Sequence, residues 1–124
     1  MTRFKMIAFI VIVGLAPASA QEKDPQSAFN TNCCQCHTMK EGDNRLGPSL
    51  YGIIGKKAGT ATNFAYSSSL KNSGITWDEA TLDKWIADPD SIITGNNMKP
   101  YTGMTDVATR ATIIAFLKQG AQKR

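Results

Sequence analysis

All three cysteines and the only histidine of this 124-residue chain lie within five consecutive positions, Cys33-Cys34-Gln35-Cys36-His37. This clustering is a poor arrangement for disulfides, because distant loops would remain unlinked. A structural zinc site needs four Cys or His ligands and would have to take all of them from this single stretch. A thioredoxin-like Cys-x-x-Cys belongs near a βαβ unit, which the surrounding pattern does not offer.

The spacing of Cys33, Cys36 and His37 is the pattern of c-type haem attachment. Two thiols at this spacing can reach the vinyl groups on one edge of a haem, and the adjacent imidazole can fold beneath the ring to bind iron. Chance clustering of buried cysteines would not explain the histidine. We therefore expect one covalent haem c, bonded to Cys33 and Cys36, with His37 as an iron ligand. Cys34 is expected to be a small buried residue, with misattachment or intermolecular oxidation as the alternatives.

No second histidine exists for the opposite face of the iron, so methionine is the natural ligand there. The candidates are Met98 and Met104, since the other methionines lie near the N-terminus or too close to His37. Met98 is favoured because Pro100 keeps its stretch out of helix, and core filling is the alternative for either residue. His/Met ligation leaves no open position on the iron, so one-electron transfer is expected rather than catalysis. An open iron would instead indicate a peroxidase or gas-binding protein, and a colourless product a haem-free domain.

Residues 1–20 have the pattern of a signal peptide. Two basic residues precede an almost wholly apolar run, Met6 to Leu15, and Ala18-Ser19-Ala20 fits the small-residue cleavage pattern. The run is roughly half of the about 20 apolar residues that a spanning helix needs, and an uncleaved anchor is the alternative. We expect residues 21–124 to form one domain in the periplasm.

The pattern predicts three or four helices and no strand pair. The first runs from Pro25 to about Cys33, capped by Asp24, with Phe29 on its inner side. Thr76-Trp77-Asp78-Glu79 has the form of a capping box before a second helix, which Asp88-Pro89 ends.

A final helix begins after Thr105 or Asp106. Its apolar stripe consists of Val107, Ala111, Ile114 and Leu117. Between the helices, the irregular stretches from Gly42 to Gly59 and from Asp90 to Met104 are too long for ordinary connections in a small domain. A buried prosthetic group would supply the missing order.

Three stretches resemble class I cytochromes c, both mitochondrial cytochrome c and its bacterial periplasmic relatives. They are the cysteine-histidine cluster, GPSLYGIIGKKAGTATNFAYS from Gly47 to Ser67, and the segment from Gly74 to Met104. The resemblance implies an all-α class I cytochrome c fold with long ordered loops around a covalently bound haem. It also implies a soluble, monomeric periplasmic carrier of single electrons between membrane redox complexes of a respiratory or photosynthetic chain.

The resemblance also assigns roles to residues. The carbonyl of Pro48 would accept the imidazole proton of His37, which would orient the ring. Met98 matches the distal ligand, and Tyr66 and Trp77 match residues that hydrogen-bond a haem propionate.

The chain also departs from the family pattern at some positions. Pro25 stands where a glycine usually lets the two terminal helices cross closely. Lys56 stands where arginine is common and cannot form the same forked contact. Trp85 and Asn96 replace a frequent tyrosine and threonine near the distal ligand, which affects the fine tuning of the potential. The contact of Phe29 with Ile113 and Phe116 is expected to persist.

The charge of the chain is mildly basic. Its 14 basic and 10 acidic residues give +4, and removing Arg3 and Lys5 with the signal peptide leaves 12 against 10. No dense Lys/Arg stripe indicates nucleic-acid binding. Five lysines in or beside the loops can form a docking patch for acidic faces of membrane redox complexes, or a generally solvated surface. They are residues 40, 56, 57, 71 and 99.

Overall fold

The computed structural model describes residues 24–121, together with 11 and 14. Five helices occur in this part of the chain: α1 (Pro25–Asn32), α2 (Ser68–Lys71), α3 (Glu79–Ala87), α4 (Pro89–Ile92) and α5 (Val107–Ala121). The only β feature among the described residues is an isolated bridge between Lys57 and Thr76, so the expected all-α class is confirmed. The helices outnumber the expected three or four because α2 and α4 are single turns of four residues. Apart from residues 11 and 14, the expected signal peptide lies outside the described residues.

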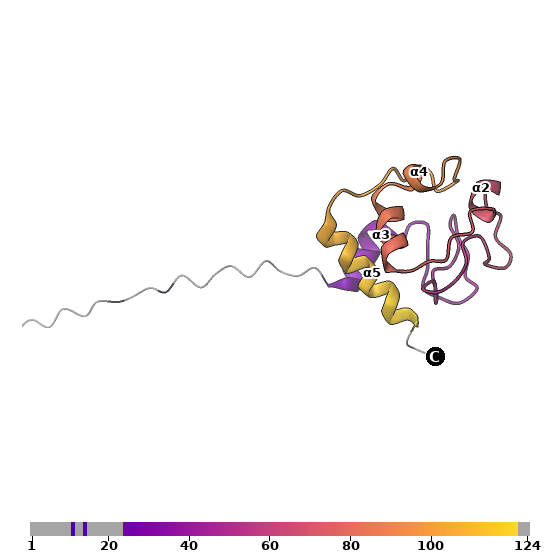
Figure 1. Ribbon diagram of the computed structural model, residues 1–124. Coiled ribbons are helices and arrows are strands. Elements are labelled where there is room, and N and C mark those ends of the chain that lie inside the picture. Colours follow the sequence, from indigo (N-terminus) through magenta and orange to yellow (C-terminus); the bar gives the residue numbers. More distant parts are fainter. Residues whose placement is uncertain (1–10, 12–13, 15–23, 122–124) are drawn as a thin grey trace, which may run out of the picture.

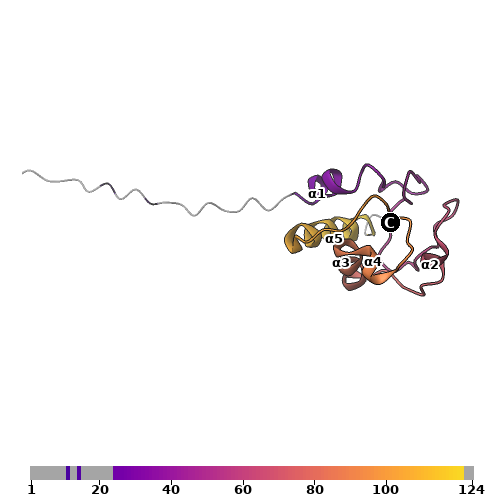
Figure 2. The same ribbon diagram turned by 90° about the horizontal axis from the view of Figure 1, so that it is seen from above.

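Helix α5 lies between α1 on one side and α3 on the other (Figures 1 and 2). The rings of Phe29 in α1 and Phe116 in α5 pack with their centroids 5.0 Å apart, as expected. Ile113 and Leu117 of α5 are almost fully buried in the same core. This packing fixes the direction in which α1 ends, one residue before the first cysteine.

The first helix begins as the sequence predicts. The Asp24 carboxylate accepts a hydrogen bond of 3.0 Å from the Ser27 amide, and Pro25 occupies the first helical position. Proline is tolerated there because its missing N–H would have no partner within the helix.

The capping box of α3 lies two residues later than the sequence pattern indicated. Asp78, not Thr76, is the N-cap: its carboxylate accepts from the Thr81 amide at 2.7 Å, and the Asp78 amide donates to the Thr81 hydroxyl at 2.8 Å. Thr76 is instead paired with Lys57 in the isolated bridge. A carboxylate is also the better cap, because its charge opposes the positive end of the helix dipole.

The expected stripe of α5 is buried only in its second half. Ile114 and Leu117 are in the core, whereas Val107 is 66% exposed and Ala111 also faces solvent. The buried side chains near the start of the helix are Thr109 and Arg110. Arg110 is held there by Asp83 of α3 at 2.7 Å and by the Met104 carbonyl at 2.8 Å, so a polar network occupies the place expected for apolar side chains.

The two long irregular stretches extend away from the α1–α5 crossing, on the side where α2 and α4 lie (Figure 1). They are held mainly by scattered backbone hydrogen bonds, such as Gly55 to the Trp77 carbonyl at 2.7 Å and Ala58 to the Ile75 carbonyl at 2.8 Å. Among the described residues, no helix has both the length and the apolar character needed to cross a membrane.

Replacing Phe29 by alanine is expected to lower the free energy of unfolding of the haem-loaded protein by about 3–5 kcal/mol, because it leaves a cavity between α1 and α5. Denaturant titration measures the change. Val107→Ala, at an exposed position of α5, should change it by less than about 0.5 kcal/mol. Equal effects of the two substitutions would contradict this view of the core.

Candidate haem site

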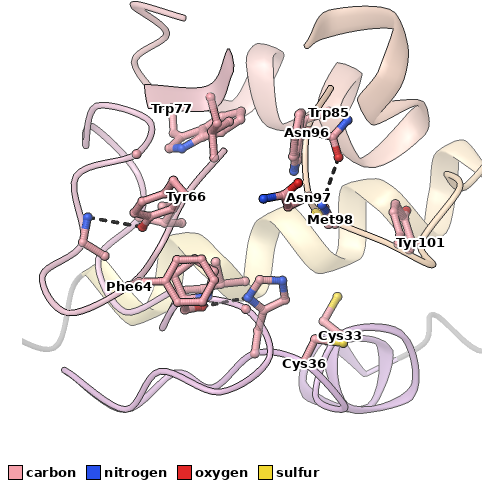
Figure 3. A pocket seen from close by; sticks show the side chains of 18 of the residues that line it. Cys33, Cys36, Phe64, Tyr66, Trp77, Trp85, Asn96, Asn97, Met98 and Tyr101 are labelled. Carbon is pink, nitrogen blue, oxygen red and sulfur yellow. Dashed lines mark hydrogen bonds between the residues drawn. The ribbon is translucent and has the colours of Figure 1, made fainter. Parts of the chain in front are cut away.

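A mainly apolar cavity lies between the helices and the two long irregular stretches (Figure 3). Helices α3 and α5 supply part of its wall, α1 and α2 contribute Asn32 and Leu70, and most of the remaining wall comes from loops. The lining includes Cys33, Cys36, His37, Pro48, Ile53, Tyr66, Trp77, Leu82, Trp85, Met98, Ile113 and Leu117. The structure therefore brings all four sequence-predicted site residues, Cys33, Cys36, His37 and Met98, to one cavity.

The end of α1 delivers the two outer cysteines to this cavity. The amides of Cys36 and His37 both donate to the Cys33 carbonyl, at 3.1 and 3.0 Å, so the cluster forms one tight turn. Burial raises the pKa of the Cys33 thiol to about 11, with the neighbouring Cys34 and Cys36 adding to the shift. This surrounding disfavours a thiolate but is compatible with a neutral thioether.

Cys34 differs from its neighbours. Its side chain is exposed, and its Sγ donates to the Asn30 carbonyl at 2.8 Å. The expectation of a buried residue was wrong: Cys34 is exposed and is not part of the cavity wall that Cys33 and Cys36 line. The geometry therefore separates Cys33 and Cys36 from Cys34.

His37 is 9% exposed, and its ring orientation is defined by the Pro48 carbonyl, which lies 2.7 Å from Nδ1. A carbonyl oxygen only accepts, so Nδ1 carries the proton and Nε2 keeps its lone pair. Burial also lowers the pKa of His37, although the hydrogen bond to Pro48 opposes this shift. Among the described residues, Nε2 has no hydrogen-bond partner, and a neutral imidazole nitrogen is left available as a ligand.

Gly47 allows the loop to pass directly across this ring. Its amide donates to the Cys36 carbonyl at 2.8 Å, and a Cβ on Gly47 would overlap the His37 imidazole. The backbone therefore lies flat against one side of the ring and prevents it from turning.

The structure separates the methionines that the sequence left open. Met98 lines the cavity, on a wall above Cys33 and Cys36 in Figure 3. Met104 is outside the cavity wall, and its amide donates to the carbonyls of Ile86 and Ala87 at the end of α3. Met39 lies in a separate small hollow with Tyr51 and Phe116.

Tyr66, Trp77 and Lys56 also line the cavity. Tyr66 and Trp77 lie on the side away from Met98 (Figure 3). The Tyr66 hydroxyl accepts from the Ala61 amide at 3.2 Å, and burial raises its pKa. Lys56 donates from Nζ to the Tyr51 carbonyl at 2.8 Å. The indole of Trp77 packs against that of Trp85 with centroids 5.4 Å apart, so the two form one aromatic wall.

Sequence reasoning missed several residues of the wall, among them Leu46, Phe64 and Tyr101. Phe64 meets Tyr66 edge to face at 4.8 Å, while Leu46 is 82% exposed at the margin of the cavity. The Tyr101 hydroxyl donates to the Ile86 carbonyl at 2.5 Å, and burial and the nearby Cys33 raise its pKa to about 12. Their only sequence signal was a large apolar or aromatic side chain within a loop.

These residues fit a haem. An imidazole with an available Nε2, two thiols and one thioether line a single apolar cavity, and that donor set matches covalent attachment with two axial ligands. A zinc site is a poor match, since no group of three or more His, Cys, Asp or Glu side chains in the described part of the chain is arranged to hold a metal ion.

Comparisons with known proteins agree with this geometry. A family model described as Cytochrome c matches residues 23–121. The chain is 46% identical to cytochrome c2 iso-2 of Magnetospirillum fulvum, over 77% of this chain and 97% of that protein. It is 38% identical to cytochrome c2 of Blastochloris viridis, over 90% of this chain and 87% of that protein.

Among solved structures, cytochrome cH from Methylobacterium extorquens superposes with a TM-score of 0.70 at 40% identity, covering 77% of this chain and 95% of that chain. The range matched by the family model, residues 23–121, includes the cysteine-histidine cluster and the loops that enclose the cavity. The chain belongs to the cytochrome c family, whose class I members bind a covalent haem c and carry electrons rather than act as enzymes.

Proposed function

We propose that this protein carries single electrons in the periplasm between membrane redox complexes of a respiratory or photosynthetic chain. The observation that carries the proposal is the donor set of the cavity: one oriented imidazole, two thiols and one thioether. The iron of a haem bound there would supply a one-electron Fe³⁺/Fe²⁺ couple.

In this proposal Cys33 and Cys36 form the two thioether bonds, and His37 and Met98 ligate the iron from opposite faces. Cys34 is excluded by its exposed position, and Met104 by its place outside the cavity wall. With both axial positions taken by the chain, substrates and oxygen have no free coordination site.

The residues around the proposed ligands limit the structural change that accompanies electron transfer. Pro48 and Gly47 hold the imidazole in one orientation, so little has to move when the charge on the site changes. The apolar wall that includes Leu82, Trp85 and Ile113 excludes water. An apolar surrounding disfavours the extra positive charge of the oxidised site, and a thioether ligand acts in the same direction, so both raise the reduction potential.

Export rests on residues 1–20, which we propose to be a signal peptide that leaves residues 21–124 as a soluble cytochrome c domain. The absence of a spanning helix among the described residues is compatible with this proposal.

For its partners, we propose short-lived docking through lysines at the margin of the cavity. Lys56, Lys57 and Lys99 are exposed and line the cavity, whereas Lys40 and Lys71 are exposed but lie outside its wall. Because Lys99 is paired with Asp90, the positive charge at this margin comes mainly from Lys56 and Lys57, and it would speed encounter with acidic partner faces at low salt. The carrier is expected to act as a monomer and not to bind nucleic acid.

Covalent attachment can be tested by denaturing the purified protein and extracting it with acidified organic solvent. Haem should stay with the wild-type chain and with Cys34→Ala, because only Cys33 and Cys36 face the cavity. The double variant Cys33→Ala/Cys36→Ala should release it. Retention of haem by the double variant would overturn the assignment.

Axial ligation can be tested by optical spectra of the ferric protein. Wild-type protein and Met104→Ala should be low-spin with the red-region band of sulfur-ligated iron, whereas Met98→Ala should lose that band and bind azide or carbon monoxide readily. Loss of the band in Met104→Ala but not in Met98→Ala would transfer the role to Met104. A high-spin wild-type spectrum would instead indicate an open iron.

Gly47→Ala is expected to displace the His37 ring, because the new methyl group would overlap ring atoms that the Pro48 carbonyl holds in place. The cost of such overpacking is about 1–3 kcal/mol in the free energy of unfolding, with a change in the haem spectrum. Gly120→Ala is the matched control: its methyl group meets only the flexible end of Met39, and alanine favours helix. Equal effects would show that the ring is not confined by Gly47.

A further inference from the structure

Asn96 is a buried polar residue two positions before Met98. It is 4% exposed and lies in the cavity wall beside Met98 and Trp85 (Figure 3). Its amide nitrogen donates to the Asp90 carboxylate at 2.8 Å and to the Ile93 carbonyl at 2.9 Å. Its amide oxygen accepts from the Met98 backbone amide at 3.0 Å, the bond drawn as a dashed line in Figure 3.

These three partners allow only one orientation of the amide. Turned over, its oxygen would face two acceptors, Asp90 and the Ile93 carbonyl, and its NH₂ group would face the Met98 N–H. The Asp90 carboxylate and the Ile93 carbonyl therefore determine that the Asn96 oxygen points at Met98.

Asp90 holds the same loop at a second point. Its carboxylate also accepts hydrogen bonds from Lys99 Nζ at 2.6 and 2.7 Å. Asp90 of α4 is therefore bonded to residues on both sides of Met98 in the sequence. The Lys99 contact is exposed, with the side chains of Lys99 and Asp90 48% and 57% accessible. A surface ion pair of this kind contributes little to stability. The Asn96 contact is partly buried and charge-assisted, and such bonds are the stronger kind. Asn96 is thus the main link.

We propose that Asn96, oriented by Asp90 and the Ile93 carbonyl, is the positioning residue that keeps the Met98 thioether on the iron. This inference rests on the proposed ligation by Met98. The Asn96 amide restrains the backbone of Met98 directly, so its loss frees the ligand's own peptide unit without disturbing the α1–α5 core. Loss of the Asn96 bond is therefore expected to change the rate at which Met98 leaves the iron, and not the free energy of unfolding of the whole domain.

The experiment measures cyanide binding to the ferric holoprotein as a function of cyanide concentration. If Met98 must leave the iron before cyanide binds, the observed rate of cyanide binding stops rising at high cyanide concentration. This plateau rate equals the rate of Met98 release. Asn96→Asp keeps the shape of the side chain and the acceptor for Met98, but replaces both amide donors with an oxygen that repels Asp90. We expect the plateau rate to rise by about tenfold or more, the scale of losing one charge-assisted hydrogen bond.

A reciprocal exchange provides the rescue. In Asn96→Asp/Asp90→Asn the donor and acceptor change places, and the hydrogen bond between positions 90 and 96 can form again. The plateau should fall clearly below that of Asn96→Asp but stay above that of wild type, because the Ile93 carbonyl still faces an oxygen at position 96. Thr94→Ala removes only an exposed side-chain bond to the Asp90 backbone carbonyl and should leave the plateau unchanged.

Phe29→Ala is the control that distinguishes a role of Asn96 in positioning Met98 from a general effect on the stability of the domain. It should lower the free energy of unfolding at the remote α1–α5 contact and leave the plateau within about threefold of wild type. If Phe29→Ala accelerates cyanide binding as much as Asn96→Asp does, Asn96 is merely structural and the proposal is overturned. The proposal is equally overturned if Asn96→Asp leaves the plateau within threefold, or if the exchange gives no rescue.

Should Asn96→Asp yield no holoprotein, Asp90→Ala carries the test, because it removes one of the two groups that orient Asn96 and leaves the Ile93 carbonyl in place. An unchanged plateau in Asp90→Ala would then overturn the proposal. A wild-type rate that rises linearly with cyanide, without a plateau and without the red-region band, would show that Met98 is no ligand and overturn the proposed ligation as well. A wild-type plateau with no response to either variant would overturn the positioning role alone.

Discussion

The hydrogen bond between His37 Nδ1 and the Pro48 carbonyl determines much of the structure around the cavity. It places the proton on Nδ1, leaves the Nε2 lone pair available, and connects the cysteine-histidine cluster to the loop that follows. Two backbone bonds reinforce it, from Gly47 to the Cys36 carbonyl at 2.8 Å and from Leu50 to the Thr38 carbonyl at 2.9 Å. With the loop held on both sides of Pro48, the imidazole has one accessible orientation, which is the requirement for a ligand that must not move during electron transfer.

On the Met98 side of the cavity, the proposed ligand is also held by hydrogen bonds, but through a side-chain amide. No helix carries Met98, and its segment is restrained through the Asn96 amide and through Asp90 of the single-turn helix α4. A side-chain amide can satisfy a backbone donor where neither helix nor sheet is available. The two proposed ligands therefore depend on loops whose geometry is imposed by particular hydrogen bonds, while α1, α3 and α5 form the rigid frame.

The distribution of apolar surface explains why such loops are tolerated in so small a domain. The helices bury Phe29, Ile113 and Leu117 against one another, but the long loops turn their apolar side chains toward the cavity. A haem in that cavity would give those side chains a surface to pack against, and the loops gain their order from it. The exposed margin, with lysines and Leu46, is what remains available to a partner.

By itself, the sequence determined the cofactor and the attachment cysteines as expectations, because three rare residues at fixed spacing are local information, and His37 had no rival in the chain. Local signals also sufficed for α1, where Asp24 and Pro25 mark the start. Only the tertiary structure placed Met98 in the cavity and Met104 outside it, exposed Cys34, moved the cap of α3 to Asp78, and buried Arg110 where an apolar stripe began. Spacing along a chain states which side chains share a face, but which face is covered depends on elements far away in sequence, and that choice is made by packing.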